Sequence, residues 1–144
     1  MTQDVFVVAY EGDDDSENVL AYAIERAQKA GARLHIMHVL EWSPYKFLTP
    51  TELEERHARR QEEMARAQSA IIDPAVARAK AAGVEAQGQM TYGNVVELVC
   101  KAAVDTGASQ IFVGRAGGGL GNRVFGSVTI GLAETAPVPV VIVP

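Results

Sequence analysis

Short, continuous apolar segments alternate along this chain with segments in which apolar residues recur at helical spacing. The run Val5–Ala9 has the length of a strand and is rich in β-branched residues, as is typical of strands buried on both faces. Further strands are expected at Leu34–Leu40, Val84–Thr91 (an edge strand), Ile111–Val113 and Val138–Val143. The alternation predicts a single α/β domain over residues 1–144, whose mostly parallel sheet is covered by helices on both faces.

Capping residues locate several helix boundaries. Gly31 is expected to end the first helix, and Asn94 with Glu97 forms a cap pattern at the start of a later one. Thr51 and Glu54 form the same pattern at the start of a long, charged helix. We expect the first part of this helix to be an exposed arm, because polar and charged residues outnumber apolar ones on all of its sides. Asp73-Pro74 predicts a break or kink within it.

Composition and charge exclude several classes of function. The formal net charge of -5 argues against non-specific binding to nucleic acids or to anionic membranes. No apolar stretch approaches the roughly 20 residues that a membrane span needs. We do not expect the N-terminal residues to form a secretory signal. The single cysteine, Cys100, excludes an intrachain disulfide and fits a reducing compartment, so a cytoplasmic location is expected.

Glycines cluster between Gly114 and Gly121, after the fourth expected strand and before a helix expected from Ser127 to Ala136. Glycines let backbone amides approach an anion closely, and a helix N-terminus adds partial positive charge. In a doubly wound sheet, ligands bind where the strand order switches, at the carboxyl ends of the strands. The glycine loop and the loop Glu11–Gly12 would meet there, which predicts a phosphate-binding site. A flexible loop without a ligand is the alternative.

Four segments together resemble the universal stress protein family, and the resemblance covers essentially the whole chain. They are Val8–Gly12, His38-Val39, Gly93–Val96 and the stretch from Gly114 through Gly126-Ser127-Val128 to Val143. The resemblance implies a five-stranded parallel sheet of order 3-2-1-4-5, doubly wound and of the adenine-nucleotide alpha-hydrolase-like type. It also implies a homodimer that forms through the last strand, Val138–Val143.

A nucleotide site is implied by the same resemblance. One branch of the family binds ATP through the pattern G-x2-G-x9-G-[S/T]. Gly114 and Gly117 match its first two glycines and Gly126-Ser127 its end, in a loop one residue shorter. The implied site comprises Ala9, Tyr10 and Val39 near the adenine, Glu11 near the ribose, and Val113, Gly114, Arg115, Gly117, Gly119, Gly126, Ser127 and Val128 near the phosphates. ATP or another adenine nucleotide is the expected ligand, with Mg2+ as a candidate companion.

No combination of residues predicts an active site. His35 and His38 lie three apart on an expected strand, so they point to opposite faces and cannot share a metal ion. Cys100 is expected to pack as a small apolar side chain. Glu11 has no second carboxylate or nucleophile evident beside it. We therefore expect no catalytic residues, no metal site and at most weak ATP hydrolysis.

Two functions remain open from the sequence. The first is a small stress-response sensor that binds an adenine nucleotide and acts through ligand-dependent contacts with a protein partner that the sequence does not identify. The second is a nucleotide-free, dimeric interaction module of the same fold. An aromatic segment, Trp42–Leu48, is expected either to pack against the long helix or to form a lid that faces a partner.

Overall fold

In the computed structural model, which describes residues 3–12, 14–41, 49–115 and 127–144, five strands form one parallel sheet. The strands are β1 (Val5–Ala9), β2 (Arg33–Glu41), β3 (Ala86–Gly93), β4 (Gln110–Gly114) and β5 (Val140–Val143). Their order is β3-β2-β1-β4-β5, with every neighbouring pair parallel. The implied strand order and the position of β3 at an edge are therefore confirmed. β5 begins two residues later than expected, directly after Pro139, which has no amide hydrogen to donate.

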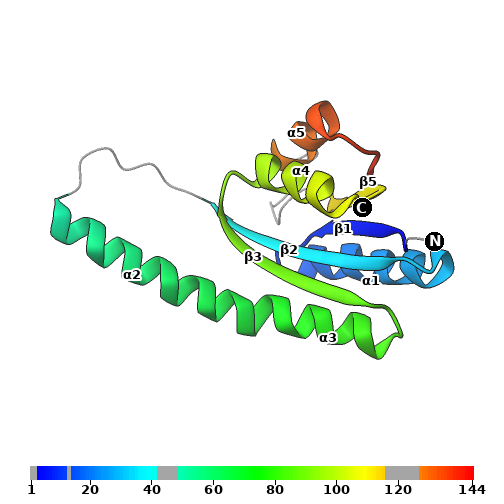
Figure 1. Cartoon of the computed structure of the whole chain (residues 1–144), viewed down its shortest axis with the longest axis horizontal. Helices are drawn as coiled ribbons and strands as arrows, with labels where there is room; N and C mark the ends of the chain where they lie inside the picture. The colour runs from blue at the N-terminus through cyan, green and yellow to red at the C-terminus, as the bar shows by residue number, and fades with distance from the viewer. Residues whose placement is uncertain (1–2, 13, 42–48, 116–126) are drawn as a thin grey trace.

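Helices cover both faces of the sheet (Figure 1). On one face lie α1 (Asp14–Ala30) and α3 (Asp73–Ala81), and on the other lie α4 (Val95–Thr106) and α5 (Ser127–Thr135). Neighbouring strand residues alternate between the two apolar cores. Val8 and Phe112 pack against α1, whereas Val7 and Ile111 pack against α4. Strands buried on both faces explain the continuous apolar runs in the sequence.

The long charged helix continues through Pro74. It consists of α2 (Pro50–Ala67), a π-helical turn η1 (Gln68–Ile72) and α3, and together they form one rod below the sheet (Figure 1). The amide of Asp73 donates to the carbonyl of Gln68, five residues earlier. The expected break is wrong, because this wider turn lets the helix pass directly into Pro74, which stands in the first turn of α3, where the absent amide hydrogen is tolerated.

The start of α2 corrects one predicted cap. Thr49, and not Thr51, is the capping residue, and its hydroxyl accepts a hydrogen bond of 3.2 Å from the amide of Glu52. Pro50 then occupies the first helical position, where its fixed φ and missing amide hydrogen are suitable. The caps expected at Gly31, with its φ of +68°, and at Asn94, which accepts from the Glu97 amide at 3.0 Å, are confirmed.

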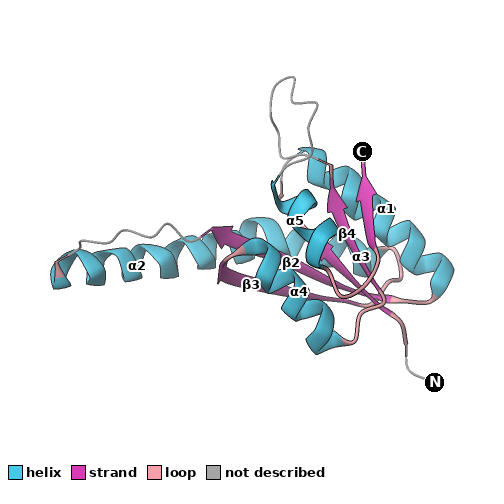
Figure 2. Ribbon diagram, turned by 90° about the horizontal axis from the view of Figure 1, so that it is seen from above, coloured by secondary structure: helices cyan, strands magenta, loops and turns pink. Residues whose placement is uncertain are grey.

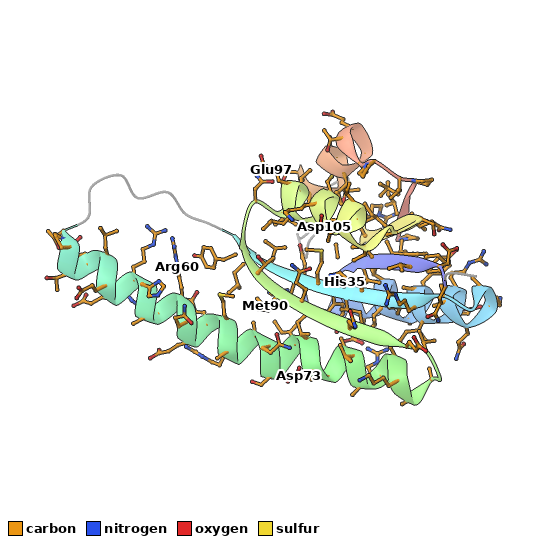
Figure 3. The ribbon with its side chains drawn as sticks, in the orientation of Figure 1. His35, Arg60, Asp73, Met90, Glu97 and Asp105 are labelled. Atoms are coloured by element: carbon orange, nitrogen blue, oxygen red, sulfur yellow. The ribbon has the colours of Figure 1, made fainter. Side chains whose placement is uncertain are left out.

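The predicted exposed arm is confirmed. α2 projects beyond the carboxyl ends of β2 and β3 (Figure 2), and Leu53 near its start is 53% exposed. A cation–π interaction joins the arm to the sheet: the Arg60 guanidinium lies 4.5 Å from the centre of the Tyr92 ring (Figure 3). The aromatic segment Trp42–Leu48 lies outside the described residues. No helix among those described is both long and apolar enough to cross a membrane.

The edge strand β3 carries a glycine beneath the π-helical turn. A Cβ placed on Gly88 would overlap Cγ2 of Ile72 and lie 3.1 Å from Cγ2 of Val76. Ile72 is fully buried and β-branched, so its methyl group cannot move aside freely. The backbone of β3 and the long helix thus approach each other as closely as they do because position 88 has no side chain.

The substitution Gly88→Ala is expected to lower the free energy of unfolding by about 1–3 kcal/mol, the usual cost of overpacking a core. Urea unfolding measures this, and Gln87→Ala at the exposed neighbouring position is the matched control. The cost should shrink when Gly88→Ala is combined with Ile72→Ala, because the overlapping methyl group is then gone. Equal stability of Gly88→Ala and the unmodified protein would contradict the prediction.

Candidate functional site

The candidate site lies where the chain leaves the two central strands in opposite directions. From the end of β1 the chain runs to α1 on one face, and from the end of β4 it leads to α5 on the other. The two strands are neighbours, with Val8 paired with Phe112. A crevice outside the carboxyl ends of such strands is the usual ligand site of a doubly wound sheet.

Four of the predicted site residues gather on the same face. Ala9, Val39, Val113 and Val128 all belong to the apolar group that packs under α4 and α5. Val113 is buried, whereas the other three are half-buried. Three strand ends and the first turn of α5 therefore contribute to a small apolar surface on this face of the sheet.

Tyr10 differs from these residues, because its side chain lies on the opposite face. Its ring is 5% exposed and packs in the core under α1, and its hydroxyl donates to Oε1 of Glu17 at 2.6 Å. Oε2 of Glu17 in turn forms an ion pair with Arg78 of α3. Only the backbone of Tyr10 is thus available at the crevice, and its ring joins β1, α1 and α3.

The peptide between Tyr10 and Glu11 is held at both ends. The Tyr10 carbonyl lies 2.8 Å from Nδ1 of His38, and the Glu11 amide donates to Oγ of Ser16 at 3.1 Å. Since a carbonyl only accepts, Nδ1 of His38 carries the proton in this contact. The Glu11 residue itself is exposed. Sequence reasoning did not identify Ser16 or the role of His38, because both depend on contacts between β2, α1 and the end of β1.

The two histidines of β2 point to opposite faces, as predicted. His35 contacts Gln89 of β3, with Nε2 and Oε1 2.6 Å apart, whereas His38 is buried beneath the loop after β1. Within the described part of the chain, no group of three or more histidine, cysteine or acidic residues could hold a metal ion. Cys100 is half-buried and packs in the apolar group under α4 and α5, as expected of a small apolar side chain.

The peptide at the end of β4 is held in the same way. The hydroxyl of Thr129, a buried residue of α5, donates to the Gly114 carbonyl at 2.7 Å. The Arg115 amide donates to the Val143 carbonyl at 3.2 Å. A Cβ on Gly114 would meet only Cγ2 of Val19, at an ordinary 3.4 Å. Among the described residues, packing therefore does not require glycine at this position.

The start of α5 lies beside a cavity formed by described residues. Ser127 is exposed at the first position of the helix, and Arg115 is exposed after β4. The cavity has a volume of about 830 Å³ and is open to solvent. Its lining comes from the end of β3, the first half of α4 and the length of α5, and it includes Gly93, Asn94, Val95, Val96, Glu97, Cys100, Ser127, Val128, Gly131 and Thr135. It overlaps the predicted site only at Ser127 and Val128.

Some predicted residues cannot be placed. Gly117, Gly119 and Gly126 lie outside the described residues. Of the predicted phosphate-binding segment, the described part thus consists of Val113, Gly114 and Arg115 at one end and of Ser127 and Val128 at the other.

Three comparisons with known proteins point to the same family over nearly the whole chain. Residues 4–144 match the model of the universal stress protein family. A curated relative from Thermus aquaticus, a universal stress protein in the QAH/OAS sulfhydrylase 3' region, is 30% identical over 141 residues, or 95% of this chain and 96% of that protein. Universal stress protein UspA from Lactobacillus plantarum superposes with a TM-score of 0.85 at 20% identity, covering 100% of this chain and 99% of the other. A universal stress protein in complex with cAMP superposes at 0.71 with 25% identity, covering 100% and 99%.

The substitution Thr129→Val keeps the shape of the side chain but removes the hydroxyl that satisfies the Gly114 carbonyl. We expect the free energy of unfolding to fall by about 1–3 kcal/mol, the cost of leaving a partly buried acceptor without this partner. Urea unfolding provides the measurement. The control is Thr135→Val in the same helix, where an exposed hydroxyl donates to a carbonyl within α5 and its loss should change little. Equal losses in the two variants would argue against a special role of the Gly114 contact.

Proposed function

The chain belongs to the universal stress protein family, and on that premise we propose that it binds an adenine nucleotide and acts through ligand-dependent contacts with a protein partner. One observation carries the proposal. At the ends of the adjacent strands β1 and β4, two exit peptides are fixed by buried side chains next to a half-buried apolar surface. A nucleotide site typically combines an apolar surface for the base with polar backbone groups in fixed positions.

The chemistry of the residues suggests how a nucleotide would lie. The apolar surface of Ala9, Val39 and Val128 suits one face of an adenine ring, and the exposed Glu11 could accept hydrogen bonds from ribose hydroxyls. Ser127 and the N-terminus of α5 suit phosphates, because the first amides of a helix and its dipole favour anions. The related protein solved with cAMP supports this class of ligand.

Glycine at position 114 supports the same placement. The described neighbours leave room for a Cβ there, so packing among the described residues does not require glycine. A backbone that must come close to a ligand does account for it. Arg115, exposed next to Gly114, could pair with a phosphate, and Mg2+ would offset the repulsion between Glu11 and a triphosphate. We therefore propose ATP, with Mg2+, as the first nucleotide to test.

The proposed activity is binding without turnover, so the output would be a change in which partner the protein contacts. A cytoplasmic location is part of the proposal and is supported by Cys100, a free and half-buried thiol of the kind found in reducing compartments.

Isothermal titration with ATP, AMP and cAMP tests the proposal. With Mg2+ present, we expect binding by the unmodified protein. For Glu11→Gln we expect about a tenfold loss of affinity for all three ligands, because each contains the ribose and its hydroxyls then meet a neutral acceptor in place of a charged one. The control is Glu134→Gln, at an exposed position at the far end of α5, and its affinities should be unchanged. Absence of binding at about 100 µM protein, well above a micromolar Kd, would favour the nucleotide-free interaction module instead.

The same proposal includes a homodimer formed through β5. The carbonyls of Pro139 and Val143 accept hydrogen bonds from β4, at 3.0 Å and 3.2 Å. Because strand residues alternate, the backbone groups of Val140 and Ile142 then point to the open edge of the sheet. An apolar edge strand with free backbone groups is a template for pairing with a second copy.

The substitution Ile142→Pro tests this dimer. Proline removes one outward-pointing amide hydrogen but leaves the bonds from β5 to β4, so the fold should persist while strand pairing across the edge is lost. Sedimentation equilibrium should then change from dimer to monomer. Ile142→Thr, which keeps the amide hydrogen, is the control and should remain dimeric. A monomeric unmodified protein, or a dimeric Ile142→Pro variant, would contradict the proposed interface.

A further inference from the structure

We propose that His38 is a positioning residue, which holds the peptide between Tyr10 and Glu11 in the orientation that nucleotide binding requires. The inference rests on the proposed function, in which Glu11 faces the ribose. His38 itself is not a ligand in this proposal. It acts through the backbone of the loop that leads to Glu11.

The first support is the contact of His38 with the loop. The imidazole is 8% exposed and sits on β2, and its Nδ1 lies 2.8 Å from the Tyr10 carbonyl. β1 ends at Ala9, and the Tyr10 amide makes one more bond of the strand type, to the Met37 carbonyl at 2.9 Å. Beyond that point hydrogen bonds within the sheet no longer determine the path of the chain. The His38 side chain of β2 forms the next contact with the backbone.

The second support lies at the other end of the same peptide. The Glu11 amide donates to Oγ of Ser16 at 3.1 Å, and Ser16 is 6% exposed in the first turn of α1. A peptide group is planar, so fixing its carbonyl and its amide together fixes its orientation. The two holding side chains come from different elements, β2 and α1, and the buried Tyr10 ring anchors the residue between them.

The consequence for binding follows from pre-organisation. A loop already ordered in the free protein does not lose conformational freedom when the ligand binds, so more of the interaction energy appears as affinity. Without the His38 donor, the Tyr10 carbonyl would turn toward water, and the direction in which the Glu11 side chain leaves the backbone would no longer be fixed. The loss should therefore appear in nucleotide affinity as well as in stability.

The experiment compares three variants by isothermal titration with AMP. His38→Leu removes the donor, while His38→Asn keeps an N–H close to the position of Nδ1. His35→Leu is the matched control on the same strand, because His35 contacts Gln89 on the other face of the sheet (Figure 3). We expect affinity to fall about tenfold or more in His38→Leu, which is the range of one buried hydrogen bond with its unsatisfied partner. His38→Asn and His35→Leu should stay within about threefold of the unmodified protein, because neither lacks that donor.

A double-mutant cycle with Ser16→Ala separates positioning from general destabilisation. Both side chains hold one peptide, so the combined loss of affinity should be smaller than the product of the two single losses. Losses that simply multiply would overturn the proposal. Ser16→Ala also tests the same peptide by itself if His38→Leu does not fold.

The outcomes are distinguishable. Unchanged affinity in His38→Leu, or equal losses in His38→Leu and His38→Asn, overturns the role of His38 while the proposed function stands. If the unmodified protein binds none of ATP, AMP and cAMP, the proposed function fails, and the role of His38 in binding fails with it. Protection of the Glu11 amide from hydrogen exchange should be retained in His38→Asn and lost in His38→Leu, and equal protection in both would also overturn the proposal.

Discussion

The parallel pairing of β1 with β4 is the constraint on which the rest of the structure depends. Because the chain leaves β1 toward one face and β4 toward the other, the two exit peptides must diverge, and neither can be held by the sheet alone. Buried side chains complete the hold. After β1 they are His38 and Ser16, and after β4 Thr129 acts together with the Val143 carbonyl of β5. The apolar cores on the two faces exclude water from these side chains. Each hydrogen bond is therefore strongly favoured, since an unpaired polar group there would cost free energy.

The long helix formed by α2, η1 and α3 also contacts the loop after β1. Gly12, in the loop after β1, has a φ of +84°, and a Cβ there would lie 2.8 Å from Cγ2 of Ile71 in the π-helical turn. The next residue of that turn, Ile72, packs on Gly88 of β3. The rod that projects as the exposed arm is therefore in contact with the loop that carries Glu11. Close-packed atoms transmit displacements to their neighbours. A change in the conformation of this loop would therefore shift the helix that bears the arm.

Local patterns in the sequence predict the parts of this structure that local physics determines. The β-branched runs predict strands, and the glycine at position 31 and the asparagine at position 94 predict helix ends, because each pattern acts within a few residues. The predicted cap of α2 lies two residues after the true one, since Thr49 and Thr51 both precede a glutamate at a similar distance. The π-helical turn, the burial of the Tyr10 ring and the His38 contact depend on packing between elements distant in sequence, which no local pattern encodes.

The backbone groups of the proposed site have a particular relation to sequence. UspA from Lactobacillus plantarum shares the fold at a TM-score of 0.85 with only 20% identity, so most side chains can differ while the strand ends keep their places. Carbonyls and amides at those ends are present whatever the side chains are. What must be specified is their orientation, and in this chain that depends on a few buried donors and acceptors. The residues that matter most for binding need not touch the ligand, because a side chain that turns one peptide decides where the next residue points.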